Sequence, residues 1–119
     1  MSQIHRIDGN ARVNRVVIHN SVAYFSGLVA LDFSGDIRDQ TLQVLERLET
    51  YLQKAGTDRS HLLSVQLWVK DIAGDIGGLN EVWNEWFLDH EKPTRATCQV
   101  AFDDPDIRLE LIATAAVPS

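Results

Sequence analysis

The stretch "DIRDQTLQVLERLETYLQKAG", residues 36–56, predicts a long helix and with it the class of the fold. Its apolar residues recur at intervals of three and four, which is the period of an amphipathic helix. They are Ile37, Leu42, Val44, Leu45, Leu48 and Leu52. Asp36 is a typical N-cap residue, and Gly56 is placed to end the helix in a left-handed turn. We therefore expect one helix that packs a single apolar face against a core.

The residues after this helix predict a strand, a loop and a second helix. "LLSVQLWVK", residues 62–70, alternates as a half-buried strand does. Its apolar set is Leu63, Val65, Leu67 and Val69. The glycine-rich "DIAGDIGG", residues 71–78, is typical of a flexible loop that leads into a helix. "LNEVWNEWFLDH", residues 79–90, predicts that helix, with an apolar stripe of Leu79, Val82, Trp83, Trp86 and Phe87.

Strands are expected on both sides of these elements. Val16–Ile18 and Val22–Ala30 are β-rich runs separated by turn residues, which predicts a hairpin. Residues 94–101 and 107–117 predict a second hairpin that turns at Asp104-Pro105. The order ββαβαββ gives an α+β fold, with two helices on one face of one mixed sheet. A second copy of the chain is the simplest cover for the other face, so a homo-oligomer is expected.

Composition and charge narrow the functional classes. The chain suits a single domain over residues 1–119. Its net charge is −6 and its 11 basic residues are scattered, which disfavours a nucleic-acid partner. No apolar run reaches the roughly 18 to 20 residues that span a bilayer, and no signal peptide is recognisable. We therefore expect a cytoplasmic protein without a membrane partner. One cysteine and dispersed histidines predict no metal site, and no cofactor is expected.

The parity of the last two strands predicts which face carries polar groups, because alternate residues of a strand share a face. The small or apolar residues, expected to face the helices, are Ala96, Cys98, Val100, Leu109, Leu111 and Ala113. The polar residues, expected on the opposite face, are Arg95, Thr97, Gln99, Arg108 and Glu110. Cys98 is thereby predicted to be a core residue and not a nucleophile.

The charge of Arg95 needs an anionic partner if a second subunit buries it. One candidate is a carboxylate of the protein, such as Glu110 of a neighbouring copy. The other is the carboxylate of a small acid, which a planar guanidinium matches with two parallel hydrogen bonds. The residues alone leave both alternatives open.

Together with the element order, four short stretches resemble the Rid (YjgF-like) family. They are "SG" at 26–27, "VKD" at 69–71, "PTRAT" at 93–97 and "RLELIATA" at 108–115, and the opening "RIDGNARVNRVVIHN" resembles the YoaB-like branch. The resemblance implies a chorismate-mutase-like fold and a homotrimer with ligand sites between subunits. It also implies a deaminase without a cofactor, which hydrolyses enamines and 2-imino acids, such as 2-aminoacrylate, to 2-keto acids and ammonia.

The resemblance also assigns roles to residues. Arg95 matches the arginine that binds the substrate carboxylate, and Glu110 matches the glutamate that acts on the attacking water. Ser26 matches the serine of the Ser-Gly pair. Thr97 stands where the archetype of the family has a cysteine, so Cys98 is not that residue's equivalent. The hydroxyls of Ser26 and Thr97 are expected to orient the water or the departing nitrogen.

Two positions near the N-terminus bear on substrate choice. Val13 stands where the archetype has a tyrosine that lines its site, and Arg12 is a candidate to line the cleft instead. A final hairpin would put Arg95 about 13 Å from Glu110 within one chain. A small substrate does not bridge that distance, so we expect the two residues to meet between two chains.

Two functions remain in competition. The first is a hydrolase of the 2-iminobutanoate/2-iminopropanoate deaminase type, which the presence of Arg95 and Glu110 favours. The second is a non-catalytic member of the family that binds small carboxylates or partner proteins. Val13 favours altered specificity or lost activity.

Overall fold

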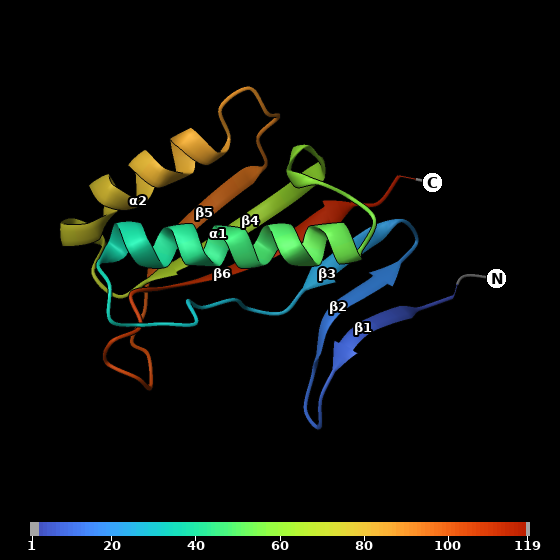
Figure 1. The fold of residues 1–119 in the computed structure, drawn as a ribbon, viewed down its shortest axis with the longest axis horizontal. Helices are drawn as coiled ribbons and strands as arrows, with labels where there is room; N and C mark the ends of the chain where they lie inside the picture. The colour runs from blue at the N-terminus through green and yellow to red at the C-terminus, as the bar shows by residue number, and fades with distance from the viewer. Residues whose placement is uncertain (1–2, 119) are drawn as a thin grey trace.

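The computed structural model describes residues 3–118, which form one six-stranded sheet and two long helices. The elements are β1 (His5–Gly9), β2 (Asn14–His19), β3 (Val22–Phe25), α1 (Ile37–Lys54), a short 3-10 helix (Arg59–His61), β4 (Leu62–Val69), α2 (Ile72–Trp86), β5 (Thr94–Gln99) and β6 (Leu109–Ala116). The sheet order is β1-β2-β3-β6-β4-β5, and Figure 1 shows α1 and α2 on one face of it. The predicted α+β class is confirmed.

Helix α1 forms as its sequence predicts. The Asp36 side chain accepts a hydrogen bond of 3.0 Å from the Asp39 amide, and Gly56 follows the helix with a φ of 81°. The apolar face is buried except for Leu42, which is 46% exposed beside the groove between the helices, so its predicted burial is wrong. Within residues 3–118, neither helix combines the length and apolarity that crossing a membrane requires.

Helix α2 begins seven residues earlier than the loop prediction for residues 71–78 allows, at Ile72 instead of Leu79. Asp71 caps the helix by accepting a hydrogen bond of 3.2 Å from the Gly74 amide. A Cβ on Gly78 would lie 2.8 Å from Ile37 Cγ2, so this glycine lets α2 approach α1 closely. The packing of the two helices outweighs the low helix propensity of the glycines.

The strand order corrects two further predictions. Strand β1 was not expected; it pairs with β2 and extends the predicted β2–β3 hairpin. The hairpin between the last two strands is wrong, because β4 lies between β5 and β6. Helix α2 carries the chain from β4 back to the same end of the sheet, so β5 adds in parallel beside β4.

The core lies between the sheet and the helices. The inward-facing strand residues include Val65, Leu67, Val69, Leu109, Leu111 and Ala113, all of them buried. Leu63 was expected among them but is 46% exposed, because the register shifts between Leu62 and Ser64 and turns Leu62 inward instead. Neither of the two long helices formed within residues 3–118 covers the opposite face (Figure 1). The expected homotrimer, which would cover that face, stays a prediction.

Candidate functional site

Strand β5 presents the opposite faces from those predicted. Val65 lies beside Arg95 and Leu67 beside Thr97 in the parallel pair of β4 and β5. Laterally aligned residues point to the same side of a sheet, and both β4 residues are buried under the helices. Arg95 and Thr97 therefore face the helices, whereas Cys98 is exposed on the open face. The predicted core position of Cys98 and the predicted open-face position of Arg95 are both wrong.

Gln99 and Arg108 were also expected on the open face, and both are instead bonded to α2. The Gln99 side chain accepts a hydrogen bond of 3.0 Å from the Ile72 amide. Arg108 Nη1 donates to Asp75 Oδ2 over 3.2 Å. Of the polar set that parity assigned to the open face, Glu110 alone is placed there.

Arg95 is a half-buried cation held by an aromatic ring and a hydroxyl. Its Cζ atom lies 5.0 Å from the centroid of the Trp83 ring in α2. Its Nε donates a hydrogen bond of 3.2 Å to Thr97 Oγ1. Burial lowers the pKa of Arg95. Among residues 3–118 no carboxylate forms an ion pair with this guanidinium.

Glu110 is a half-buried carboxylate on the open face. It stands directly opposite Trp68 in the antiparallel pair of β4 and β6, between the inward-facing Leu109 and Leu111. Burial raises the pKa of Glu110, and the negative charge of Asp103 raises it further. Within the described residues the Glu110 side chain has no hydrogen bond or salt bridge that would stabilise its charge.

The Ser-Gly pair lies against Glu110. A Cβ atom on Gly27 would overlap Glu110 Oε2, so the absence of a side chain at Gly27 makes room for the carboxylate. Ser26 Oγ donates a hydrogen bond of 2.6 Å to the carbonyl oxygen of Asn14. Gly27 thus lies against Glu110 with Ser26 next to it in the chain, and the serine hydroxyl keeps only its lone pairs for a ligand.

Arg95 does not join this cluster within one chain. Glu110 is level with Trp68, and Trp68 is level with Cys98, three residues along β5 from Arg95. Two strand spacings and a three-residue offset separate the two backbone positions by about 14 Å. Their side chains also point to opposite faces. The predicted separation was similar, although it was based on the wrong strand pairing.

The two N-terminal candidates lie at the end of a projecting hairpin. Arg12 is exposed in the turn between β1 and β2, and Val13 is 47% exposed beside it. Figure 1 shows this turn extending away from the layer of helices. The amides of both residues are bonded to Asn10 Oδ1, which fixes the turn. Neither side chain contacts the Arg95 region in a single chain.

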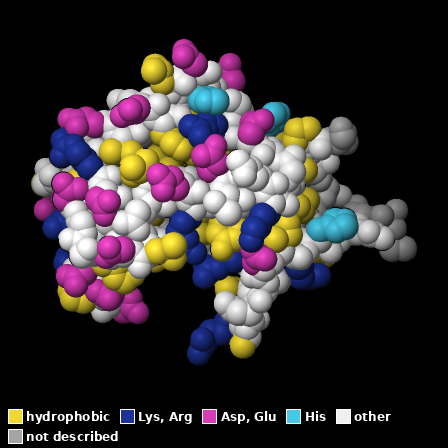
Figure 2. All heavy atoms as spheres, viewed as in Figure 1, with side chains coloured by type: hydrophobic (Ala, Val, Ile, Leu, Met, Phe, Trp, Pro, Cys, Tyr) yellow, Lys and Arg dark blue, Asp and Glu magenta, His cyan; other side chains and the backbone are white. Residues whose placement is uncertain are grey.

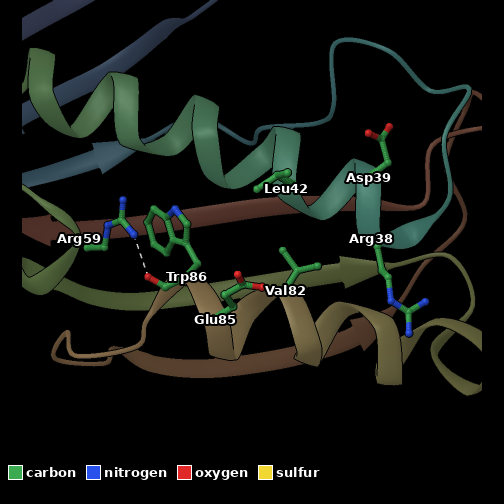
Figure 3. A pocket seen from close by; sticks show the side chains of 7 residues that line it. All are labelled: Arg38, Asp39, Leu42, Arg59, Val82, Glu85 and Trp86. Atoms are coloured by element: carbon green, nitrogen blue, oxygen red, sulfur yellow. Dashed lines mark hydrogen bonds between the residues drawn. The ribbon is translucent and has the colours of Figure 1, made fainter.

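A groove of about 470 Å³ lies on the outer side of the helical layer, between α1 and α2. Its lining residues are Arg38, Asp39, Leu42, Arg59, Val82, Glu85 and Trp86 (Figure 3). Figure 2 shows hydrophobic side chains among acidic ones in this part of the surface. No predicted site residue lines the groove. The described residues also contain no cluster of three or more side chains suited to hold a metal ion.

Sequence reasoning missed three contributors to the site. Trp83 was assigned to the core alone, Gly27 was noted without its relation to Glu110, and Asp103 was treated as part of a turn. The position of Trp83 beside β5 could have been predicted from the order strand, helix, strand in the sequence. A strand–helix–strand connection lays α2 against the neighbouring parallel strand, and therefore against β5.

Comparisons with known proteins cover almost the whole chain. The family described as Endoribonuclease L-PSP matches residues 3–117. A RutC family protein of Haemophilus ducreyi is 37% identical over 114 residues, which are 96% of this chain and 97% of that protein. RutC family protein YoaB of Escherichia coli is 32% identical over 96% of this chain and 98% of its own length. The crystal structure of a YjgF family member from Neisseria meningitidis has 26% identity and a TM-score of 0.93, over 98% of this chain and 97% of that one.

Proposed function

The chain belongs to the Rid (YjgF-like) family, matched under the description Endoribonuclease L-PSP and with YoaB among its relatives, and on this premise we propose that it is an enamine/imine deaminase. Its substrates are small 2-imino acids of the 2-iminobutanoate and 2-iminopropanoate type. Its products are the 2-keto acids and ammonia. Each site is formed between two chains of a homotrimer.

The observation that carries this proposal is the unsatisfied charge of Arg95. A half-buried guanidinium without an acidic partner among residues 3–118 favours an anion from outside the chain. Glu110 is the complementary case, because it is half-buried and forms no salt bridge with a cation of residues 3–118. A cleft between two chains brings Arg95 of one copy toward Glu110 of the next. A 2-imino acid fits between them, because its carboxylate satisfies Arg95 and its reactive carbon faces Glu110.

The reaction follows from these positions. Arg95 binds the substrate carboxylate and fixes the iminium carbon in place. Glu110, whose raised pKa suits a base, takes a proton from water as the water oxygen adds to that carbon. It returns the proton to the nitrogen of the resulting carbinolamine. The C–N bond then breaks, ammonia leaves, and the hydroxyl proton passes to Glu110 as the keto group forms. Glu110 releases this proton to the departing ammonia or to solvent, which restores the carboxylate.

The two hydroxyls have different parts in this scheme. Ser26 donates its proton to Asn14, so toward a ligand it accepts a hydrogen bond from the water or from the nitrogen. Thr97 accepts a hydrogen bond from Arg95 Nε and therefore orients the guanidinium. This role replaces the one expected from the sequence, which was to orient the water or the departing nitrogen. None of the steps draws electrons or a ligand position from a cofactor.

One structural feature favours a second function, a non-catalytic protein that binds small carboxylates. Arg12 and Val13 are exposed at a projecting turn and supply no tyrosine hydroxyl to a site. A retained Arg95 would then capture the carboxylate without any following reaction. Cleavage of RNA, which the family description names, is disfavoured by the net charge of −6.

The test generates 2-iminobutanoate or 2-iminopropanoate with an amino acid oxidase and follows the appearance of the keto acid. The wild-type protein should accelerate hydrolysis of both imines. Glu110→Gln keeps the shape of the side chain but removes the base, so it should lower the rate constant by about 100-fold or more. Absence of any acceleration by the wild-type protein would rule out the deaminase, and binding of keto acids without acceleration would select the second function.

A further inference from the structure

Trp83 contacts the helix-facing side of Arg95. It lies in α2, is 7% exposed, and packs against Phe87 with ring centroids 4.6 Å apart. Its position is therefore fixed by the core. The Arg95 Cζ lies over the same ring at 5.0 Å, so a rigid aromatic surface supports a cation on an edge strand.

An aromatic ring suits this position better than a carboxylate would. The face of an indole attracts a guanidinium by the electrostatic field of the ring, and tryptophan is the strongest of the aromatic side chains in this respect. The ring thereby offsets part of the cost of burying Arg95. It offers no oxygen to accept hydrogen bonds, so the guanidinium stays available to an anion.

Thr97 limits which atoms of Arg95 remain available. Arg95 Nε is already engaged in donating to Thr97 Oγ1 over 3.2 Å. No hydrogen bond or salt bridge within residues 3–118 uses either Nη atom of Arg95. A carboxylate therefore meets the guanidinium end-on, through its two Nη groups, and does not approach from the Nε side.

We propose that Trp83 is a positioning residue that, together with Thr97, holds the guanidinium of Arg95 so that its two Nη groups receive a carboxylate end-on. The proposal rests on the deaminase function, because that function supplies the carboxylate. It predicts that Trp83 sets the affinity for 2-keto and 2-imino acids without touching them. The effect on catalysis then arises through substrate affinity.

The same helix provides a matched control. Arg59 Cζ lies 4.1 Å from the centroid of the Trp86 ring, one turn further along α2. Arg59 Nη1 donates over 2.8 Å to the Trp86 carbonyl oxygen, and Nη2 forms a 2.5 Å salt bridge with Glu49 (Figure 3 draws the first of these). Both Nη groups of this arginine are engaged inside the chain. Loss of the Trp86 ring should therefore leave ligand binding unchanged.

The experiment measures the dissociation constant of 2-oxobutanoate, a stable product analogue, by calorimetry. Trp83→Leu should weaken binding by about fivefold to thirtyfold, and Trp83→Phe, which keeps a weaker ring, should fall between it and the wild type. Trp86→Leu should bind within about twofold of the wild type. All variants are measured below the lowest of their melting temperatures.

A spectroscopic readout keeps the proposal testable if Trp83→Leu does not fold. The NMR line of the Arg95 Nε proton, identified by its loss in Arg95→Lys, should be displaced by the ring current of Trp83 in the wild-type protein. A position typical of unstacked arginines would overturn the proposal. Equal binding by the wild type, Trp83→Phe and Trp83→Leu would overturn the role of Trp83 alone. Absence of binding by the wild type would overturn the proposed function and this inference together.

Discussion

Two arginines lie over two tryptophans of α2, and their guanidinium groups differ in their hydrogen-bond and ion-pair partners. Arg59, over Trp86, reaches Glu49 and a backbone carbonyl in its own chain. Arg95, over Trp83, donates from Nε to a threonine hydroxyl and pairs with no carboxylate of residues 3–118. The first pair joins the end of α2 to α1 as a closed ion-pair network. The second presents an open cation at the edge of the sheet.

The carboxylates repeat this contrast. Glu49 has Arg59 as its partner, whereas Glu110 forms no salt bridge with a cation of residues 3–118, and the charge of Asp103 adds to the effect of burial in raising its pKa. Leaving a charge of either sign half-buried and unpaired reduces stability. The proposed function accounts for both charges, because a substrate site needs a cation and a base that the same chain does not neutralise.

The largest expected effect comes from truncating each arginine. Arg95→Ala should lower kcat/KM for imine hydrolysis by about 100-fold, because it removes a charge-assisted, two-point contact with the carboxylate. Arg59→Ala should leave kcat/KM within about threefold of the wild type. The order should reverse in urea denaturation, where Arg59→Ala loses about 1 to 3 kcal/mol of unfolding free energy and Arg95→Ala loses less. Equal loss of activity in the two variants would contradict the idea that Arg95 is available to a ligand whereas Arg59 is satisfied within its own chain.

A smaller effect is expected from the charge near Glu110. The rate should fall on the acid side as pH drops through the raised pKa of Glu110, because the protonated carboxyl no longer accepts a proton. Asp103→Asn removes one cause of that rise, so the acid limb of the pH–rate profile should move to lower pH. Added salt should reduce the difference between this variant and the wild type, since Asp103 is exposed.

Asp106→Asn is the control for this shift, because it removes a charge from the same loop and Asp103, not Asp106, is the charge that raises the pKa of Glu110. Its acid limb should coincide with that of the wild type. If the acid limb does not move in Asp103→Asn, or moves equally in both variants, the titration of Glu110 is not the cause of the acid limb.

Local patterns predicted the helices and the central strands, and they failed where a tertiary contact decides. The period of α1, its cap at Asp36 and its end at Gly56 are properties of neighbouring residues, so they were readable. The start of α2 could not be predicted in this way, because a glycine such as Gly78 is typical of a loop. Its place in the helix depends on the close approach of Ile37, which is a tertiary contact. The order of β4, β5 and β6 depends on the path of a crossover, which periodicity does not record.

The faces of β5 show a second limit of sequence patterns. Parity correctly placed Leu109 and Leu111 inward, since large aliphatic residues identify the core face. In β5 the alternatives were small residues, such as Ala96 and Cys98, and a long arginine. An arginine can rest its stem and its charge on an aromatic ring, so its polarity did not show which face it occupies. The family resemblance suggested Arg95 and Glu110 as site residues, whereas the structure supplies the distance between them.

In the proposed deaminase, Arg95 of one chain acts with Glu110 of another. Co-refolding Arg95→Ala chains with an equal amount of Glu110→Gln chains tests it directly. A site shared between neighbours should recover about a quarter of the wild-type activity over the whole mixture, because each intact side is supplied half of the time. Wild-type chains mixed with the double variant should likewise retain about a quarter of the activity, and not half. A first mixture as inactive as its two parents, with the second mixture at half, would place both residues in a site within one chain and contradict the account.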